Sequence, residues 1–194
     1  MSRRAIFMDR DGTVSDEVGY INHIDRYRML PRSAEAIRRI NDSGFLAFVV
    51  TNQAGVARGL FEEPLIHEVH ATLKRWLSDA GARLDGIYYC PHHPREGSPP
   101  WRQECDCRKP KPGLLLRAAR EHDVDLGASY MIGDTVLDIE AARNAGATGV
   151  LVLTGYGKGD LKYRMVPRGL TPAYVAGDLL EAVGWILERE KRVP

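Results

Sequence analysis

Acidic side chains recur in this sequence at places where they could share a metal ion. Asp9 and Asp11 directly follow the apolar run Ala5–Met8, and Asp134 and Asp138 stand four positions apart later in the chain. Carboxylates that meet at one place repel one another unless a cation is present. Oxygen ligands with room for water and phosphate suit Mg²⁺, and a carboxylate can itself act as a nucleophile. The pattern therefore indicates a magnesium site with the means for group transfer.

Two further clusters carry groups that suit a phosphate. Thr51-Asn52-Gln53 supplies a hydroxyl and amides after a second apolar run, and Arg108-Lys109 supplies positive charge before a helical pattern. A transferring phosphoryl group carries negative charge that needs such partners. We interpret Lys111 as a solvated neighbour. Together the acidic, hydroxyl and basic clusters favour phosphoryl transfer.

Alternating strand and helix patterns must position these clusters. Helical spacing and cap residues predict helices over 33–41, 64–81, 114–122 and 136–145 and from 178 onward, and short apolar runs predict strands at 5–8, 45–50, 87–89, 130–132, 149–153 and 174–176. Such alternation predicts a Rossmann-like three-layer α/β/α fold with a mostly parallel central sheet. Ligands bind at the carboxyl ends of the strands in such sheets, and the clusters stand there.

Three local expectations accompany this fold. Residues 154–172 are rich in glycine and basic residues and predict an irregular loop. Asp178 and Glu181 are spaced as in a capping box at the start of the last helix. His67 and His70 are expected on the surface of the helix that begins near residue 64.

A loop rich in cysteine, histidine and proline spans residues 90–107. An odd cysteine count and the short Cys-x-Cys spacing argue against a disulfide framework. Four soft ligands suit a tetrahedral structural Zn²⁺ site, which would tie down the loop and place Arg108 and Lys109 beside the phosphate. His93 is the rival for the histidine position. The predicted zinc ligands are Cys90, His92, Cys105 and Cys107.

Length and charge bound the remaining possibilities. The chain has 194 residues and a net charge of +1, so we expect one domain over 1–194. The balanced charge argues against a nucleic-acid surface. Apolar runs are far shorter than the ~20 residues that cross a bilayer, and the N-terminus lacks the pattern of a secretory signal. We therefore expect a cytoplasmic monomer with no nucleic-acid or membrane partner.

The four clusters together resemble the motifs of the haloacid dehalogenase superfamily of phosphotransferases. The matching residues are, in order, Asp9-Arg-Asp11-Gly-Thr13, then Thr51, then Lys109, then Gly133-Asp134 with Asp138. Each motif alone is weak, but all four fall at a strand end or a helix start in the expected order. The resemblance implies a Mg²⁺-dependent phosphomonoesterase that forms an aspartyl-phosphate.

The resemblance also implies a role for each residue. Asp9 would be the nucleophile, and Asp11 would be the general acid and then the general base. Mg²⁺ would be held by the Asp9 carboxylate, the Asp11 backbone carbonyl and Asp134, while Asp138 would orient a metal-bound water. The residues expected to hold the phosphoryl oxygens are Thr51, Asn52, Gln53 and Lys109.

The sequence leaves no room for a large cap domain, so an open site is expected. Within the superfamily, the zinc loop resembles two groups of small phosphatases, which act on heptose 1,7-bisphosphate and on histidinol phosphate. Residues 19–23 and 51–59 resemble the first group, which implies removal of a sugar C7 phosphate. Arg58 and Arg108 are then candidates for binding the second phosphate. Thr135 is a departure, because that group often carries a lysine there.

Other functions stay open at this point. Histidinol phosphate, or another small sugar phosphate, is the first alternative substrate. A polynucleotide 3′-phosphatase is disfavoured by the lack of excess positive charge. A zinc-stabilised binding module without activity predicts a missing catalytic residue, and the set is complete.

Overall fold

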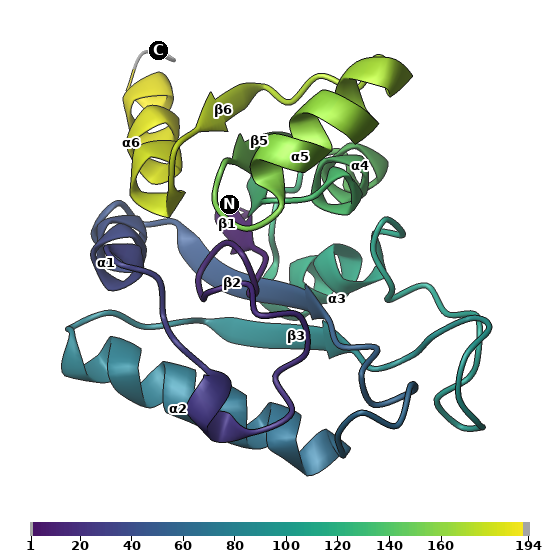
Figure 1. Cartoon of the computed structure of the whole chain (residues 1–194). Helices are drawn as coiled ribbons and strands as arrows, with labels where there is room; N and C mark the ends of the chain where they lie inside the picture. The colour runs from purple at the N-terminus through teal and green to yellow at the C-terminus, as the bar shows by residue number, and fades with distance from the viewer. Residues whose placement is uncertain (1, 192–194) are drawn as a thin grey trace.

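A computed structural model describes residues 2–191 and contains a six-stranded sheet (Figure 1). The strand order is β3-β2-β1-β4-β5-β6, and every neighbouring pair is parallel, which confirms the predicted sheet. The two ends of the predicted domain, residues 1 and 192–194, lie outside the described residues. The strands are β1 (Ala5–Met8), β2 (Leu46–Asn52), β3 (Gly86–Cys90), β4 (Tyr130–Gly133), β5 (Thr148–Val152) and β6 (Tyr174–Ala176).

Helices cover both faces of this sheet, as predicted for three layers (Figure 1). Successive residues of β1 alternate between the faces: Ile6 and Met8 join one apolar cluster, and Ala5 and Phe7 join the other. The first cluster contains buried residues of α1 (Ser33–Asp42), α2 (Glu63–Asp79) and α6 (Leu179–Glu190), and the second contains those of α3 (Gly113–His122) and α4 (Val136–Ala145). Burial on both faces explains why the central strands are apolar throughout.

The prediction of an irregular loop over 154–172 was wrong. The segment contains α5 (Gly157–Asp160), a π-helical turn (Leu161–Met165) and a 3₁₀ turn (Val166–Arg168). Met165 is buried in a cluster with residues of α4 and β5, so tertiary packing overrides the local glycine and charge content.

The last helix begins as predicted, with one difference in its cap. The Asp178 carboxylate accepts a hydrogen bond from the Glu181 backbone N–H. The Glu181 carboxylate accepts instead from the N–H of Gly177, one residue before the position that a capping box requires.

The site is built from loops at the carboxyl ends of the central strands. The loop that follows β3 extends beyond the end of that strand (Figure 1). Within residues 2–191, none of the helices has the length and apolar character to span a bilayer.

Candidate active site and metal centres

A cavity of about 180 Å³ opens where the carboxyl ends of β1, β2 and β4 meet. It brings together residues that are up to 147 positions apart in sequence, because parallel strands end at the same edge. The lining residues that the sequence predicted as site residues are Asp9, Asp11, Thr51, Asn52, Gln53, Arg108 and Lys109.

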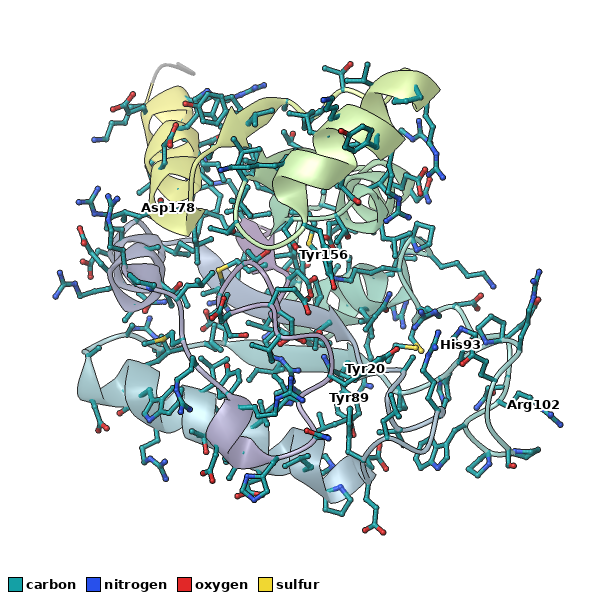
Figure 2. The ribbon with its side chains drawn as sticks, viewed as in Figure 1. Tyr20, Tyr89, His93, Arg102, Tyr156 and Asp178 are labelled. Carbon is teal, nitrogen blue, oxygen red and sulfur yellow. The ribbon has the colours of Figure 1, made fainter. Side chains whose placement is uncertain are left out.

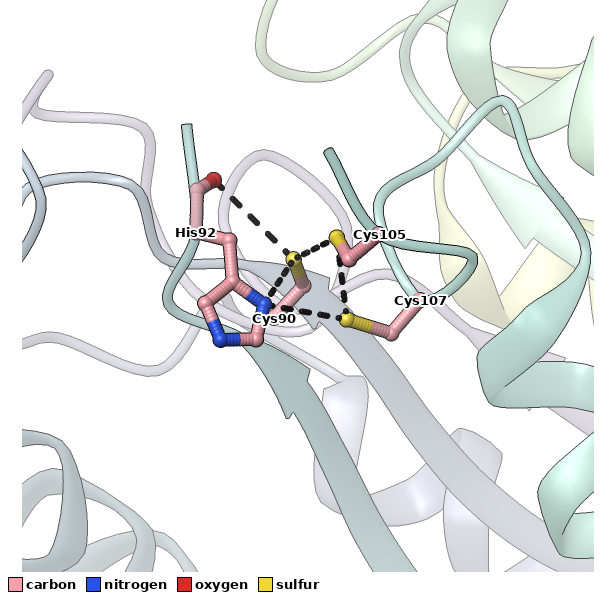
Figure 3. Close-up of side chains that lie close together, drawn as sticks. All are labelled: Cys90, His92, Cys105 and Cys107. Atoms are coloured by element: carbon pink, nitrogen blue, oxygen red, sulfur yellow. Dashed lines mark hydrogen bonds between the residues drawn. The ribbon is translucent and has the colours of Figure 1, made fainter. Parts of the chain in front are cut away.

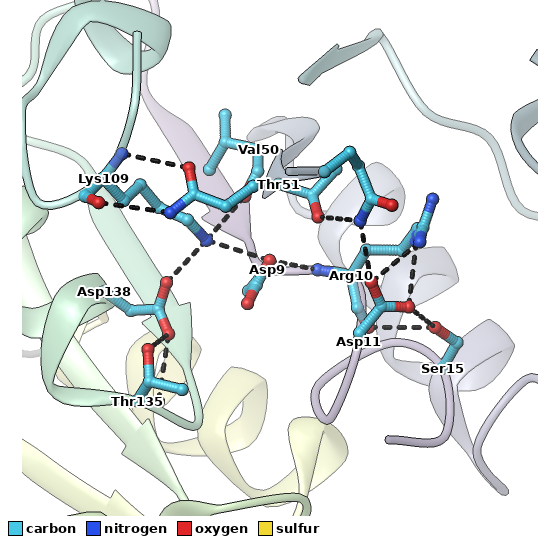
Figure 4. A network of polar contacts seen from close by, with 11 residues as sticks. Asp9, Arg10, Asp11, Ser15, Val50, Thr51, Lys109, Thr135 and Asp138 are labelled. Carbon is cyan, nitrogen blue, oxygen red and sulfur yellow. Dashed lines mark hydrogen bonds and ion pairs between the residues drawn. The ribbon is translucent and has the colours of Figure 1, made fainter. Parts of the chain in front are cut away.

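Lys109 is the buried cation at the centre of the site (Figure 4). Its Nζ lies 2.9 Å from Asp9 Oδ1 and 2.6 Å from Asp138 Oδ1, and it donates a hydrogen bond to the Val50 carbonyl. Burial alone would lower the pKa of Lys109, but Asp138 and Asp9 outweigh burial and raise it. Lys109 is therefore held as a positive charge between two carboxylates.

Three buried carboxylates face this lysine. Asp9, Asp134 and Asp138 each offer an oxygen, and these oxygens lie within 4.8 Å of one another. Burial is the main cause that raises the pKa of Asp9 to about 7 and that of Asp134 to about 8. Asp134 Oδ1 is buried with no hydrogen-bond partner. One lysine cannot balance three carboxylates, so the donor set fits a divalent cation with oxygen ligands.

Two glycines and a backbone N–H set the position of Asp134. Gly12 and Gly155 both adopt positive φ, and a Cβ on either would lie 2.3 Å or 2.2 Å from Asp134 Oδ2. The Tyr156 N–H donates to the same oxygen at 2.8 Å. Asp134 Oδ2 is thus closely surrounded by main chain, whereas Oδ1 has no hydrogen-bond partner.

Asp138 is held at the start of α4 by Thr135. The backbone N–H and the hydroxyl of Thr135 both donate to Asp138 Oδ2, at 3.0 and 2.6 Å. Thr135 stands where the resemblance led us to expect a lysine, and its short side chain closes the first turn of the helix. With its other oxygen on Lys109, Asp138 links the lysine to α4.

The Asp11 carboxylate points toward Arg10 rather than toward Asp9 (Figure 4). Arg10 donates to both of its oxygens, from Nε at 3.0 Å and from Nη2 at 2.7 Å. The Gln53 side-chain amide and the Ser15 hydroxyl also donate to this carboxylate. A proton transfer from Asp11 to a leaving group would require it to exchange one of these contacts.

Arg10 and His70 are functional-site neighbours that the sequence analysis missed. Arg10 is 1% exposed, and its Nη1 lies 3.2 Å from His70 Nε2. The expectation that His70 lies on the helix surface was wrong: it is 8% exposed, and burial followed by the Arg10 charge lowers its pKa to about 3. The signal was present, because His70 stands at helical spacing from the buried residues Ile66 and Leu73.

The polar residues at the end of β2 form hydrogen bonds with one another, with Asp11 and with the backbone of Lys109. The Asn52 side chain exchanges two hydrogen bonds with the backbone of Lys109, at 3.1 and 3.0 Å. Gln53 Nε2 donates to Thr51 Oγ1 at 2.9 Å as well as to Asp11. Asn52 therefore fixes the start of the lysine side chain, while Gln53 connects Thr51 to Asp11.

The four predicted soft ligands lie together at the end of β3 and in the loop that follows it (Figure 3). Cys105 Sγ lies 3.5 Å from Cys90 Sγ and 3.3 Å from Cys107 Sγ, and His92 Nδ1 lies 3.8 Å and 3.4 Å from the sulfurs of Cys90 and Cys107. A tetrahedron with bonds of about 2.3 Å has edges of about 3.8 Å, so the spacing fits a tetrahedral metal. His93 lies outside this cluster, since its Nδ1 accepts backbone hydrogen bonds.

The two arginines predicted to bind substrate have different positions. Arg108 lines the cavity, and its Nη1 donates to the His92 carbonyl at 3.3 Å. Arg58 is not among the lining residues; its Nη1 lies 2.9 Å from Glu96 Oε2, and its guanidinium is 5.9 Å from the Tyr20 ring. The role of Arg58 stays a prediction.

Known proteins are similar to this chain in sequence. The HAD-hydrolase-like family model matches residues 106–182. The chain is 46% identical over 154 residues to D-glycero-beta-D-manno-heptose-1,7-bisphosphate 7-phosphatase of Pasteurella multocida (strain Pm70), covering 79% of this chain and 83% of the relative. It is 42% identical over 190 residues to D-glycero-D-manno-heptose-1,7-bisphosphate 7-phosphatase of Thermosynechococcus vestitus (strain NIES-2133 / IAM M-273 / BP-1), covering 96% of each.

A solved structure agrees with this result. The crystal structure of D,D-heptose 1,7-bisphosphate phosphatase from B. bronchiseptica, complexed with magnesium and phosphate, has a TM-score of 0.84 and 35% identity, covering 96% of this chain and 99% of that chain. Fold and site thus define a hydrolase of the haloacid dehalogenase-like class. Within that class, the chain belongs to the family of the D-glycero-D-manno-heptose-1,7-bisphosphate 7-phosphatases.

Proposed function

We propose that this chain is a Mg²⁺-dependent phosphomonoesterase that removes the C7 phosphate of D-glycero-D-manno-heptose 1,7-bisphosphate. The observation that carries the proposal is 42% identity over 96% of the chain to a relative of that name. The buried constellation of Asp9, Lys109 and Asp134 supports the chemistry. The near-neutral net charge supports a small-molecule substrate. We also propose that the protein is a cytoplasmic monomer.

Asp9 is the nucleophile in the proposed reaction. Its carboxylate oxygen attacks the phosphorus of the C7 phosphate, the bond to the sugar oxygen breaks, and an aspartyl-phosphate forms. Lys109 neutralises negative charge on the phosphoryl oxygens, and Thr51 donates a hydrogen bond to them. The Asp9 carboxylate, the Asp11 backbone carbonyl and Asp134 would hold Mg²⁺, which would supply further positive charge at the phosphoryl group.

Asp11 is the proton donor and acceptor in this proposal. It protonates the departing sugar oxygen and then takes a proton from the water that hydrolyses the aspartyl-phosphate. Arg10 and Gln53 hold this carboxylate two residues from the nucleophile, and Asp11 would exchange one of these hydrogen bonds for the reacting oxygen. The same group serves both steps because its protonation state alternates.

We further propose that the cysteine–histidine cluster holds a structural Zn²⁺. Its four ligand atoms are spaced as the corners of a tetrahedron, and they belong to the four predicted ligands Cys90, His92, Cys105 and Cys107. The cysteines must lose their thiol protons to bind the metal, so zinc binding would be accompanied by proton release. Zinc there would fix the loop that ends in Arg108 and Lys109.

Phosphate release with Mg²⁺ on three substrates tests the proposed function. The substrates are the α and β anomers of the heptose bisphosphate and histidinol phosphate, with Asp9→Asn as the inactive control. We expect kcat/KM to favour one heptose anomer by ~100-fold, which is ~2.7 kcal/mol of transition-state discrimination. A preference for histidinol phosphate would overturn the substrate while leaving the chemistry. Full activity of Asp9→Asn would overturn the nucleophile.

A further inference from the structure

The catalytic cavity is too small to enclose a whole sugar bisphosphate. It measures about 180 Å³, whereas pockets that enclose most of a drug-sized ligand measure ~300–1,000 Å³. Asp9 and Lys109 line this cavity, so the transferring phosphate must lie in it. The sugar therefore has to rest on side chains at the mouth of the cavity, and these side chains decide which phosphate esters bind well.

Tyr156 is a half-exposed aromatic ring at this mouth. Its side chain is 54% exposed and lines the cavity together with Asp9 and Lys109. Figure 2 shows Tyr156 and Tyr20 near the centre of the view, on the loops that follow β5 and β1. Covering an exposed aromatic ring with a ligand is favourable because apolar area is removed from water. The exposed ring of Tyr156 therefore offers area that the substrate can bury.

The backbone around Tyr156 contacts Asp134 and the segment that follows β1. Its N–H donates to Asp134 Oδ2, and a Cβ on Gly155 would lie only 2.7 Å from Gly12 Cα. The Thr154 hydroxyl donates to the Gly12 carbonyl, which ties the loop to the segment carrying the nucleophile. The backbone of Tyr156 is thus anchored to Asp134 and to the segment that carries Asp9.

Glu17 stands across the mouth from this ring. Both residues line the same cavity, and the negative charge of Glu17 is the largest cause that raises the pKa of the Tyr156 phenol. A phenol and a carboxylate both exchange hydrogen bonds with hydroxyl groups. The mouth therefore combines an apolar ring face with polar groups at its rim. A polyol that has C–H groups on one face and hydroxyls at its edge matches this combination.

We propose that Tyr156 determines specificity by packing its ring against the sugar of the substrate while the phosphate occupies the cavity. This inference rests on the proposed function, since it assigns a wall of the same site to the sugar. It places a residue of the C-terminal segment, which no motif of the chain includes, in contact with the part of the substrate that does not react. The hydroxyl of Tyr156 contributes less than the ring in this arrangement.

The test compares kcat/KM for the heptose bisphosphate with kcat/KM for acetyl phosphate, a small acyl phosphate without a sugar. For Tyr156→Ala we expect the ratio of the two to fall about tenfold, which corresponds to ~1.4 kcal/mol. Tyr156→Phe keeps the ring and should hold the ratio within threefold. Tyr163→Ala is the matched control, because Tyr163 is 69% exposed on the same segment and does not line the cavity.

Two results would overturn the inference. Equal losses on both substrates would show that Tyr156 acts through Asp134 and not on the sugar, and an unchanged ratio would show that the ring does not touch it. Failure of the proposed function has a different signature: wild type would hydrolyse acetyl phosphate but not the heptose bisphosphate. The same variants are then tested on the sugar phosphate that wild type prefers. If the ratio of kcat/KM on that substrate to kcat/KM on acetyl phosphate is unchanged in Tyr156→Ala, the role of Tyr156 is again overturned.

Discussion

Removal of the buried charge of Lys109 is the sharpest perturbation that the structure offers. Lys109→Met keeps the length of the side chain but leaves Asp9 and Asp138 without the cation that lies 2.9 and 2.6 Å from them. Loss of one partner from a buried ion pair typically costs ~3–5 kcal/mol. In a chain of 194 residues that corresponds to a drop in Tm of roughly 6–20 °C, at ~2–4 °C per kcal/mol.

The size of this drop should depend on pH. The pKa of Asp9 is already raised to about 7 by burial, so below that pH the carboxyl can take up a proton in place of the lost lysine charge. We therefore expect a small loss of Tm at pH 5.5 and a larger loss at pH 8.5. Phosphatase activity should fall at least 100-fold, the cost of removing one preorganised donor.

Thermal melts and phosphate release decide the outcome. Both are measured in Mg²⁺-free and Mg²⁺-containing buffer without chelator, so that metal on the cysteine cluster is not removed. Lys111→Met is the matched control, because Lys111 is exposed two residues away. If Lys109→Met had the same Tm as wild type at pH 8.5, the result would refute the view that Lys109 neutralises the buried carboxylates.

Three further outcomes follow from the geometry. Cys107→Ser should lower both the zinc content and the Tm; a variant that is fully loaded and equally stable would exclude Cys107 from the ligand set. Arg108→Ala should reduce kcat/KM more on the heptose bisphosphate than on acetyl phosphate, and equal losses would make Arg108 a general phosphate ligand. Without Mg²⁺, stability should fall as pH rises from 5 to 8.5, because the raised pKa values of Asp9 and Asp134 keep protons on the folded state that the unfolded carboxylates have lost. Mg²⁺ should reduce that fall, and a Tm in Mg²⁺-free buffer that does not change with pH would contradict the assignment.

The parallel sheet and the meeting of the motifs could be predicted from the sequence. Strand periodicity and helix signals are local properties, and a parallel sheet brings the ends of β1, β2 and β4 to one edge whatever the details of the loops. Cys90, His92, Cys105 and Cys107 were also predictable, because metal ligands are recognised by residue type and spacing alone.

The orientation of side chains within the site could not be predicted in the same way. The Asp11 carboxylate turns toward Arg10, and Arg10 also contacts a buried histidine of α2 that is 60 residues away from it. Arg58 lies within the segment that resembles the family, yet it pairs with Glu96 outside the cavity. A sequence pattern specifies which groups are present, whereas competing partners from other elements decide which way each group faces.

The C-terminal segment shows why part of the site leaves no trace in a motif. The backbone N–H of Tyr156 donates to Asp134, and the Asp160 carboxylate accepts from the N–H of Val136 at the first turn of α4. One short segment thereby contacts both Asp134 and the first turn of the helix that carries Asp138. A backbone N–H has no residue type, so its contribution is invisible to a search for chemical groups. The carboxylates of the site are recognisable because they carry the chemistry, while much of what orients them is main chain from a region that looked like an irregular loop.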